Sequence, residues 1–371
     1  MKIREQVKTA HGRSDKAGTD YKCLSCGGDL AFNPQTQIIN CLYCGAGIAV
    51  EVERRPICDY EMDSADQSVN INWGAIKKVF HCNNCGAESI LDGNTTARYC
   101  AFCGSTHLVR YEDAAGVAPE AIIPFKVPKS KAEKNFASWM KKRRFAPGAL
   151  QSTYRRQSIS GVYIPYWSYR AEGTSEYTAE AGMHYEVTEK KLVKKDGKSE
   201  MVEQKVKKTS YSKVSGNHDS SFKDVLVNAS RQLKSSVIVR VEPFRMEELV
   251  PYASGFLAGF LAEKFSLTLD DGWEEAKKRM DREIESAIKR DIRADEVKNL
   301  SVKTSYSNRR YRLLLLPLWV SSYSYNNKIY HFMVNGQTGK VSGEAPVSAL
   351  KVVAFLAAIA AIIALIVFLF R

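Results

Sequence analysis

Residues 21–48 read YKCLSCGGDLAFNPQTQIINCLYCGAGI, and residues 80–107 read FHCNNCGAESILDGNTTARYCAFCGSTH. The two stretches align without a gap, and every cysteine of the first stretch recurs 59 positions later in the second. Each stretch carries two C-x-x-C-G turns that are separated by 14 residues. The chain therefore contains one small module in two copies.

Two turns of this kind supply four thiolates at tetrahedral geometry, which is the ligand set of a structural zinc site. Metal binding would hold together a hairpin whose apolar core is too small to fold alone. The glycine after each second cysteine gives the backbone the freedom that such a turn needs. The sequence predicts two zinc ribbons with one Zn²⁺ each, bound by Cys23, Cys26, Cys41 and Cys44 in the first and by Cys82, Cys85, Cys100 and Cys103 in the second.

Other uses of paired cysteines are an iron site of rubredoxin type, a thioredoxin-like redox pair and two pairs of disulfides. Redox chemistry needs only one C-x-x-C pair, so four regular pairs favour metal binding. Ligand sets could also cross between the repeats, although sequential sites are simpler. The ninth cysteine, Cys58, is left over and is interpreted as a linker thiol.

The balance of charge indicates an anionic partner. The 371 residues include 54 basic and 41 acidic side chains, which gives a net charge of +13. Such an excess suits nucleic acid or an anionic lipid surface, and its sign alone does not choose between them. Basic clusters such as Lys205 to Lys208 would ordinarily be solvated, with contact to anionic lipid as the next interpretation.

An apolar run near the C-terminus predicts a membrane anchor. Val352 to Phe370 holds 19 residues without a charge, which as a helix would span the hydrocarbon core of a bilayer. Residues 1–20 are polar and do not resemble a signal peptide. Lys340 and Lys351 precede the span, so we expect a single-pass protein whose N-terminal region is cytosolic.

The fold class expected is multidomain, with two small β zinc ribbons, a β-rich α+β domain and one C-terminal transmembrane helix. The predicted segments are a polar tail at 1–20, ribbon 1 at 21–48, a linker at 49–79, ribbon 2 at 80–110, the α+β domain at 121–345 and the anchor at 350–371. Asp59, Glu61 and Asp63 are expected to form a solvated acidic part of the linker.

Within the α+β domain, the periodicity of apolar residues predicts five elements. They are a helix at 131–144, a strand at 161–181, a hairpin at 183–215 that turns at Asp196-Gly197, an amphipathic helix at 273–292 and a closing hairpin at 330–341. Residues 315–319 are weakly similar in sequence to residues 163–167, which suggests a diverged duplication.

No catalytic constellation is apparent in the sequence. Gly336-Gln337-Thr338-Gly339-Lys340 lacks the spacing of a phosphate-binding loop, and Gly216-Asn217-His218-Asp219 has no upstream partner that would build a two-metal site. There is also no nucleophile elbow or nucleotide fingerprint. We therefore expect a protein that is not an enzyme.

The paired C-x-x-C-G turns resemble the zinc ribbon named after general transcription factor B, a module that binds DNA, RNA or protein. The layout with Ile123-Pro124-Phe125, Tyr163-Ile164-Pro165-Tyr166-Trp167 and the C-terminal span resembles bacterial membrane-associated zinc-ribbon proteins of the YdjG type. That resemblance implies PspA-type or flotillin-like partners in an envelope-stress system. Some relatives are labelled primosomal helicases, but this sequence has no helicase motif.

The leading hypothesis is a scaffold that is anchored in the bilayer and recruits partner proteins at the cytosolic membrane face. Four cysteines fill the coordination shell of zinc, so the ribbons would act structurally rather than catalytically. The alternative is a membrane-associated protein that binds nucleic acid. It has the charge balance in its favour but lacks an aromatic and basic readout motif.

Overall fold

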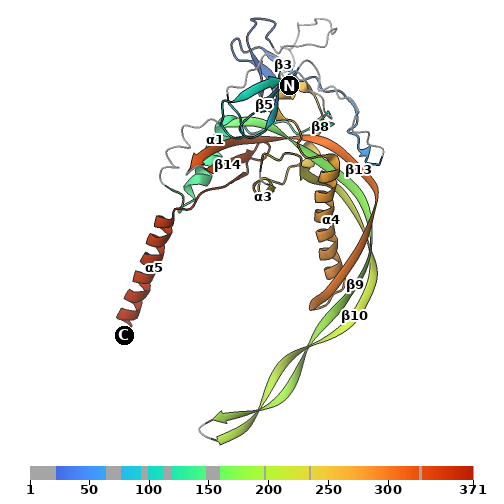
Figure 1. Ribbon diagram of the computed structural model, residues 1–371, viewed down its shortest axis with the longest axis vertical. Coiled ribbons are helices and arrows are strands. Elements are labelled where there is room, and N and C mark those ends of the chain that lie inside the picture. Colours follow the sequence, from blue (N-terminus) through green and yellow to red (C-terminus); the bar gives the residue numbers. More distant parts are fainter. Residues whose placement is uncertain are drawn as a thin grey trace, which may run out of the picture.

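Three long antiparallel strands form a curved ribbon that is the frame of the molecule (Figure 1). The computed structural model describes residues 22–63, 77–92, 99–111, 118–147, 159–195, 198–233, 235–325 and 328–370. The predicted tail at 1–20 lies outside these residues. The elements are β1 Leu30–Asn33, β2 Ile38–Cys41, β3 Gly47–Ala49, β4 Tyr60–Glu61, β5 Lys77–Cys82, β6 Glu88–Asp92, β7 Leu108–Tyr111, β8 Ala121–Ile122, α1 Lys129–Lys141, β9 Ser160–Lys195, β10 Lys198–Asn228, α3 Ser235–Ile238, η2 Met246–Glu248, β11 Val250–Pro251, η3 Ser254–Leu257, β12 Leu261–Glu263, α4 Leu269–Asp291, β13 Glu296–Tyr325, β14 Lys328–Asn335, β15 Val341–Gly343 and α5 Ala349–Leu369.

Strand β9 lies between β10 and β13 and pairs with both. The sequence predicts a strand at 161–181 and a separate hairpin at 183–215, and this division is wrong because β9 runs unbroken from Ser160 to Lys195. Gly182 at the supposed boundary remains in the ladder, opposite Tyr211. Lys195 pairs with Lys198, which fits the predicted turn, although Asp196 and Gly197 themselves lie outside the described residues.

Helix α4 packs on the concave side of this ribbon (Figure 1). Its N-cap, Thr268, accepts a hydrogen bond from the backbone of Asp271, and acidic residues in the first turn and basic residues in the last turn suit the helix dipole. The amphipathic helix predicted at 273–292 is confirmed, with two differences. The helix begins one turn earlier, at Leu269, and ends one residue earlier, at Asp291.

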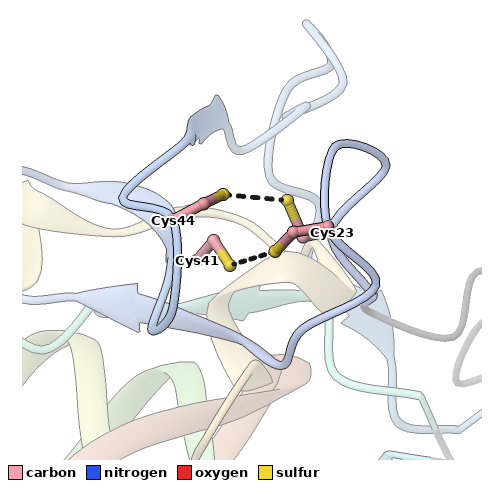
Figure 2. A group of neighbouring side chains, drawn as sticks. Cys23, Cys41 and Cys44 are labelled. Atoms are coloured by element: carbon pink, nitrogen blue, oxygen red, sulfur yellow. Dashed lines mark hydrogen bonds between the residues drawn. The ribbon is translucent and has the colours of Figure 1, made fainter.

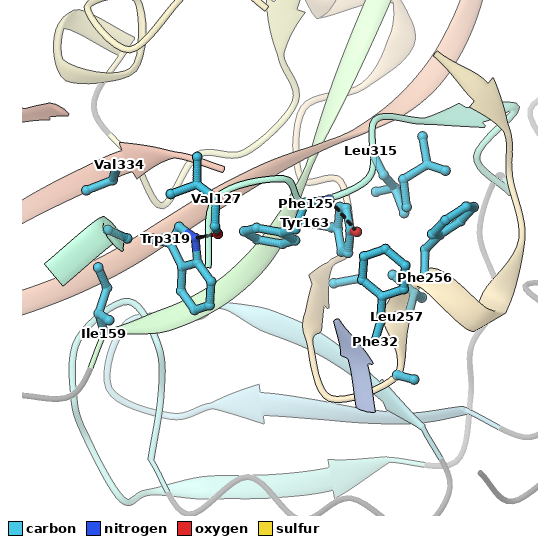
Figure 3. Packing of buried hydrophobic residues seen from close by; sticks show 14 of the residues in the cluster. Phe32, Phe125, Val127, Ile159, Tyr163, Phe256, Leu257, Leu315, Trp319 and Val334 are labelled. Carbon is cyan, nitrogen blue, oxygen red and sulfur yellow. Dashed lines mark hydrogen bonds between the residues drawn. The ribbon is translucent and has the colours of Figure 1, made fainter. Parts of the chain in front are cut away.

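Two tryptophans join the long strands to neighbouring segments. Trp167 of β9 donates its Nε1–H to the Leu267 carbonyl, and Trp319 of β13 donates to the Val127 carbonyl, at 2.9 and 2.8 Å. The similar segments 163–167 and 315–319 overlap in the ladder, where residues 163–165 of β9 pair with residues 315–317 of β13. Figure 3 shows Trp319 beside Phe125 and Tyr163 in an aromatic core that also receives Phe32 from ribbon 1.

The shorter predicted elements are also present. Helix α1 buries Ala132, Phe136 and Met140 on one face, as expected for the helix at 131–144. The closing hairpin is formed by β14 and β15, which pair Val334 with Val341. The sequence therefore placed these local elements correctly to within a few residues.

The two ribbons occupy different positions. Strands β1, β2 and β3 of ribbon 1 form a separate three-stranded sheet, whereas β5, β6 and β7 of ribbon 2 belong to the large sheet. Ile90 of β6 pairs with Ala262 of β12, and β12 in turn runs parallel to β9. Ribbon 2 is thus continuous with the body of the protein.

Part of the predicted linker is built into the body. Strand β4 pairs with β13, and the Asp59 carboxylate lies 3.0 Å from the guanidinium of Arg170 and 3.4 Å from that of Arg312. The expectation that this acidic stretch is solvated is wrong for Asp59, whose side chain is 13% exposed. Its charge is balanced by two arginines that lie more than a hundred positions after Asp59 in the sequence.

Helix α5 leaves the body as a single apolar rod (Figure 1). Ser348 caps it by accepting from the Lys351 backbone, and the Phe355 ring meets the Phe145 ring edge to face at 5.3 Å. Within the described residues, α5 is the one helix long and apolar enough to cross a membrane, and none of its most apolar window is buried.

Candidate metal centres

Four tight turns with the same backbone geometry position the cysteines. In each turn the glycine after the second cysteine donates its N–H to the carbonyl of the first cysteine, as Gly27 does to Cys23 at 2.7 Å and Gly86 to Cys82 at 2.8 Å. The four glycines have φ between 73° and 76°, which is the left-handed region. The predicted need for glycine at these positions is confirmed.

Each repeat brings its four thiols together in one cluster, and Figure 2 shows the cluster of the first repeat. The Sγ atoms of Cys23 and Cys44 are 3.5 Å apart, as are those of Cys26 and Cys41. In the second repeat the corresponding separations are 3.6 and 3.7 Å. A tetrahedral centre with Zn–S bonds of about 2.3 Å requires sulfur separations of about 3.8 Å, so both clusters fit such an ion after a small expansion.

In each cluster the pKa of one thiol is lowered and the pKa of the thiol hydrogen-bonded to it, Cys26 or Cys85, is raised. Backbone N–H groups of Cys44 and Tyr43 lower the pKa of Cys41 to about 6, and a hydrogen bond with Cys85 lowers the pKa of Cys100 to about 5. Thiolates are the form of cysteine that binds metal. Each cluster therefore contains a thiol that is prepared to lose its proton near neutral pH.

The structure decides between some of the alternatives left by the sequence. The described residues include all nine cysteines, and none of them forms a disulfide. The clusters assemble within each repeat rather than across repeats. Cys58 is exposed and belongs to neither cluster, and its backbone N–H donates to Glu120 at 3.0 Å. Two four-cysteine clusters that could hold metal ions are thus present.

The surroundings of the two clusters differ sharply. In ribbon 2, Ala101 and Phe102 on the second turn are 5% and 1% exposed, and the Phe102 carbonyl lies 2.8 Å from His331 Nε2 of β14. The equivalent residues of ribbon 1, Leu42 and Tyr43, are 70% and 75% exposed. Leu24 on the first turn of ribbon 1 is 92% exposed.

We call Leu24, Leu42 and Tyr43 the knuckle patch of ribbon 1. Sequence reasoning missed these residues because it treated the turns only as sources of thiolates. A signal was available in the sequence. Leu24 and Leu42, which lie between the paired cysteines of ribbon 1, are large and apolar, whereas the equivalent residues of ribbon 2 are Asn83 and Ala101. Apolar side chains at an exposed turn indicate a contact surface.

Comparison with known proteins gives one relative over nearly the full length. A protein of Bacillus subtilis (strain 168), "Uncharacterized protein YdjG", is 30% identical to this chain over 345 residues, which are 92% of this chain and 94% of that protein. The chain belongs to the YdjG family. No family model matches the chain, and no solved structure matches it significantly. Because the match to YdjG covers 92% of the chain, the cysteine segments alone cannot account for the family relationship.

Proposed function

We propose that this YdjG-family protein is a membrane-anchored zinc-ribbon scaffold that recruits a partner protein to the cytosolic membrane face, in a system that responds to envelope stress. Zinc is the proposed metal because both clusters offer four thiolates near tetrahedral spacing. A four-thiolate shell leaves no position for substrate or water. The ions would therefore stabilise the ribbons and would not take part in catalysis.

Helix α5 supports the anchoring part of the proposal. Its 21 residues correspond to about 31 Å of helix, which matches the hydrocarbon thickness of a bilayer. Leu350, Leu365 and Phe368 are exposed by 80%, 57% and 78%, and such an apolar surface is unfavourable in water. Lys351 in the first turn favours the orientation in which the body is cytosolic.

The exposed knuckle patch is the observation that supports the recruitment of a partner protein. The repeat supplies an internal comparison, because the same turn is covered by the body in ribbon 2 and exposed in ribbon 1. Burying Leu42 and Leu24 against a partner would contribute about 1.5–3 kcal/mol for each side chain. Tethering by α5 also confines the patch to a thin layer beside the membrane, which raises its effective concentration for a partner there.

The partner proposed is a protein with an apolar surface, and PspA-type and flotillin-like proteins are the first to test. The test uses full-length protein in its membrane and a Leu24→Ser, Leu42→Ser variant, which leaves all eight cluster cysteines in place. We expect the variant to keep two metal ions and to capture at least tenfold less of these partners in the membrane fraction.

The matched control is Val109→Ser, which removes an apolar side chain of ribbon 2 that is 40% exposed. This variant should capture partners as the natural chain does. Unchanged capture by the Leu24→Ser, Leu42→Ser variant would exclude the knuckle patch as the docking surface.

A further inference from the structure

Helix α1 ends beside the start of α5 (Figure 1). Three contacts join the segment after α1 to α5. The Ser348 backbone N–H donates to the Phe145 carbonyl at 2.8 Å, and Lys351 Nζ donates to the Ala146 carbonyl at 2.6 Å. The Phe145 ring meets the Phe355 ring at 5.3 Å. The segment after α1 is therefore held against the first two turns of α5.

The residues directly before these contacts are strongly basic. Residues 141–144 read Lys-Lys-Arg-Arg, so four consecutive side chains carry a charge of +4, and we call them the KKRR segment. All four are exposed, and in the described part of the chain no carboxylate pairs with any of them. The guanidinium of Arg143 lies over the Trp139 ring at 4.4 Å. The charge of the segment is thus not offset locally.

The dipole of α1 accounts for only part of this charge. Basic side chains interact favourably with a helix C-terminus, and the effect falls off within the last turn. Lys141 lies in that turn and Lys142 is the C-cap, but Arg143 and Arg144 lie beyond the helix. A helix end that is merely solvated does not require these two arginines. An anionic ligand beside the start of α5 would use them.

The contacts with α5 fix the level of the KKRR segment relative to a bilayer. If α5 crosses the bilayer, its first turn lies where the hydrocarbon begins, and the lipid phosphates lie directly outside it. Aromatic side chains are common at this boundary, and Phe145 lies there, 36% exposed. Lys351 of α5 is already bound to the Ala146 carbonyl. The neighbouring KKRR segment is left to face the phosphates.

The tilt of α5 does not change this level. In Figure 1 the β9–β10 hairpin runs beside α5, and its charged strands cannot enter hydrocarbon, so α5 must turn away from the hairpin when it inserts. Residues 344–348, between β15 and α5, form neither helix nor strand and can provide this rotation. Ser348 and Lys351 lie at or next to that pivot. Their contacts with residues 145 and 146 therefore stay at the headgroup level at any tilt.

We infer that the KKRR segment binds the phosphate groups of anionic phospholipids in the leaflet that faces the body. This inference rests on the anchoring part of the proposed function and is independent of the knuckle patch, which lies on ribbon 1. A lysine or arginine close to an anionic surface strengthens the attraction about fivefold. Arginine can also hold a phosphate group with two parallel hydrogen bonds. The segment would collect anionic lipids around the start of α5.

The test reconstitutes the full-length chain into vesicles that hold equal amounts of phosphatidylcholine and phosphatidylglycerol. Mild detergent then extracts the chain, and the ratio of the two lipids that remain bound is measured. We expect an excess of phosphatidylglycerol of roughly 25-fold, which falls when the extraction is done at high salt. Lys142→Gln with Arg144→Gln should bring the ratio close to that of the vesicles. Arg143, which contacts Trp139, stays in place.

The matched control is Lys131→Gln with Lys134→Gln, which removes two exposed charges from α1 itself. These residues precede Lys142 by at least eight positions, or about 12 Å of helix, which exceeds the Debye length of about 8 Å. The control should keep the excess of phosphatidylglycerol. Equal binding of the two lipids by the natural chain, or an unchanged excess in the Lys142→Gln, Arg144→Gln variant, would overturn the inference.

Two further outcomes would also overturn it. Complete displacement of phosphatidylglycerol by an equal concentration of glycerol phosphate would show a site for a soluble phosphate. Retention of an oligonucleotide without retention of phosphatidylglycerol would assign the segment to nucleic acid. The anchor is scored separately, by carbonate extraction of the same vesicles. Release by carbonate contradicts the proposed anchor, whereas a chain that resists carbonate and shows no excess of phosphatidylglycerol contradicts only this inference.

Discussion

Gly272 lies on the buried face of α4, where the helix meets β9. A Cβ at this position would be 2.3 Å from the Tyr169 hydroxyl and 2.9 Å from Cδ1 of Trp167. Neither side chain can move easily, because Tyr169 and Trp167 donate hydrogen bonds to the Leu269 and Leu267 carbonyls. Glycine here permits the close approach of helix and sheet.

We predict that Gly272→Ala destabilises the protein by up to about 2 kcal/mol. Alanine improves helix propensity by about 1 kcal/mol, but overpacking of a rigid core costs about 1–3 kcal/mol. Thermal unfolding of the full chain in detergent would show the decrease. Combining Gly272→Ala with Tyr169→Phe removes the nearest atom and should recover part of the loss. A more stable Gly272→Ala variant would show that helix propensity dominates.

Glu263 is a buried carboxyl group of β12, 1% exposed. Its Oε1 accepts a hydrogen bond from Ser230 at 2.6 Å, and its Oε2 has no partner among the described residues. Burial raises the pKa of Glu263 from its ordinary value of 4.5 to about 8. The folded chain therefore holds a proton that the unfolded chain releases above pH 4.5.

Because of Glu263, the stability of the fold should depend on pH. Stability contributed by the neutral carboxyl is lost as the pH rises from 4.5 towards 8, by on the order of a few kcal/mol. Glu263→Gln should remove this dependence, so the variant should gain stability relative to the natural chain between pH 5 and pH 8. Denaturant unfolding at pH 5 and at pH 8 measures the free energy of unfolding of both proteins, and Glu247→Gln, at an exposed position, is the control. A constant difference between the natural chain and Glu263→Gln would show that the carboxyl is not neutral in the fold.

At the scale of elements, the two ribbons should respond differently to loss of metal. Cys82, Cys100 and Phe102 belong to a core cluster that includes Val162 of β9 and Leu316 of β13. Cys23 and Cys41 belong to another core cluster, which includes Tyr163 and Leu315 of the same two strands, but ribbon 1 forms its own sheet. Both cysteine clusters therefore pack against the body through side chains, and the second is joined to it through the large sheet as well.

We predict that Cys82→Ser with Cys85→Ser and Cys23→Ser with Cys26→Ser each remove one metal ion per chain. The former should lower the unfolding temperature of the body more, because ribbon 2 shares the large sheet with the body and the metal-binding energy of about 10–16 kcal/mol would stabilise that sheet. Metal analysis and tryptophan fluorescence measure the two effects. Loss of both ions in either variant would indicate crossed ligand sets, and equal unfolding temperatures would show that ribbon 2 is not coupled to the body.

The elements that the sequence predicts well are those set by local pattern. The cysteine clusters follow from two short turns, and α4 follows from apolar residues that recur every three or four positions. The length of β9 could not be predicted, because its outer part is a charged strand with no third strand and no buried face. The place of ribbon 2 depends on the pairing of Ile90 with Ala262, and spacing within the repeat carries no information about it.

At the scale of the whole molecule, α5 determines where the protein resides in our proposal. We predict that deleting residues 349–370 moves the protein from the membrane to the soluble fraction, because burial of this apolar helix is the dominant anchoring interaction. Carbonate extraction of membranes measures the change. A deletion variant that resists carbonate extraction would place the anchor elsewhere.

The pairing of β9 with β13 also has a consequence for how the chain folds. Val320 pairs with Ser160, and β10 and α4 are both synthesised between these two strands. The β9–β10 hairpin and α4 can form early because their contacts are local, whereas contacts between distant residues form slowly. Until β13 arrives, β9 presents an open edge, since α4 covers a face of the sheet and not its edge. The folding intermediate in which β13 is missing should therefore be the species most prone to aggregate.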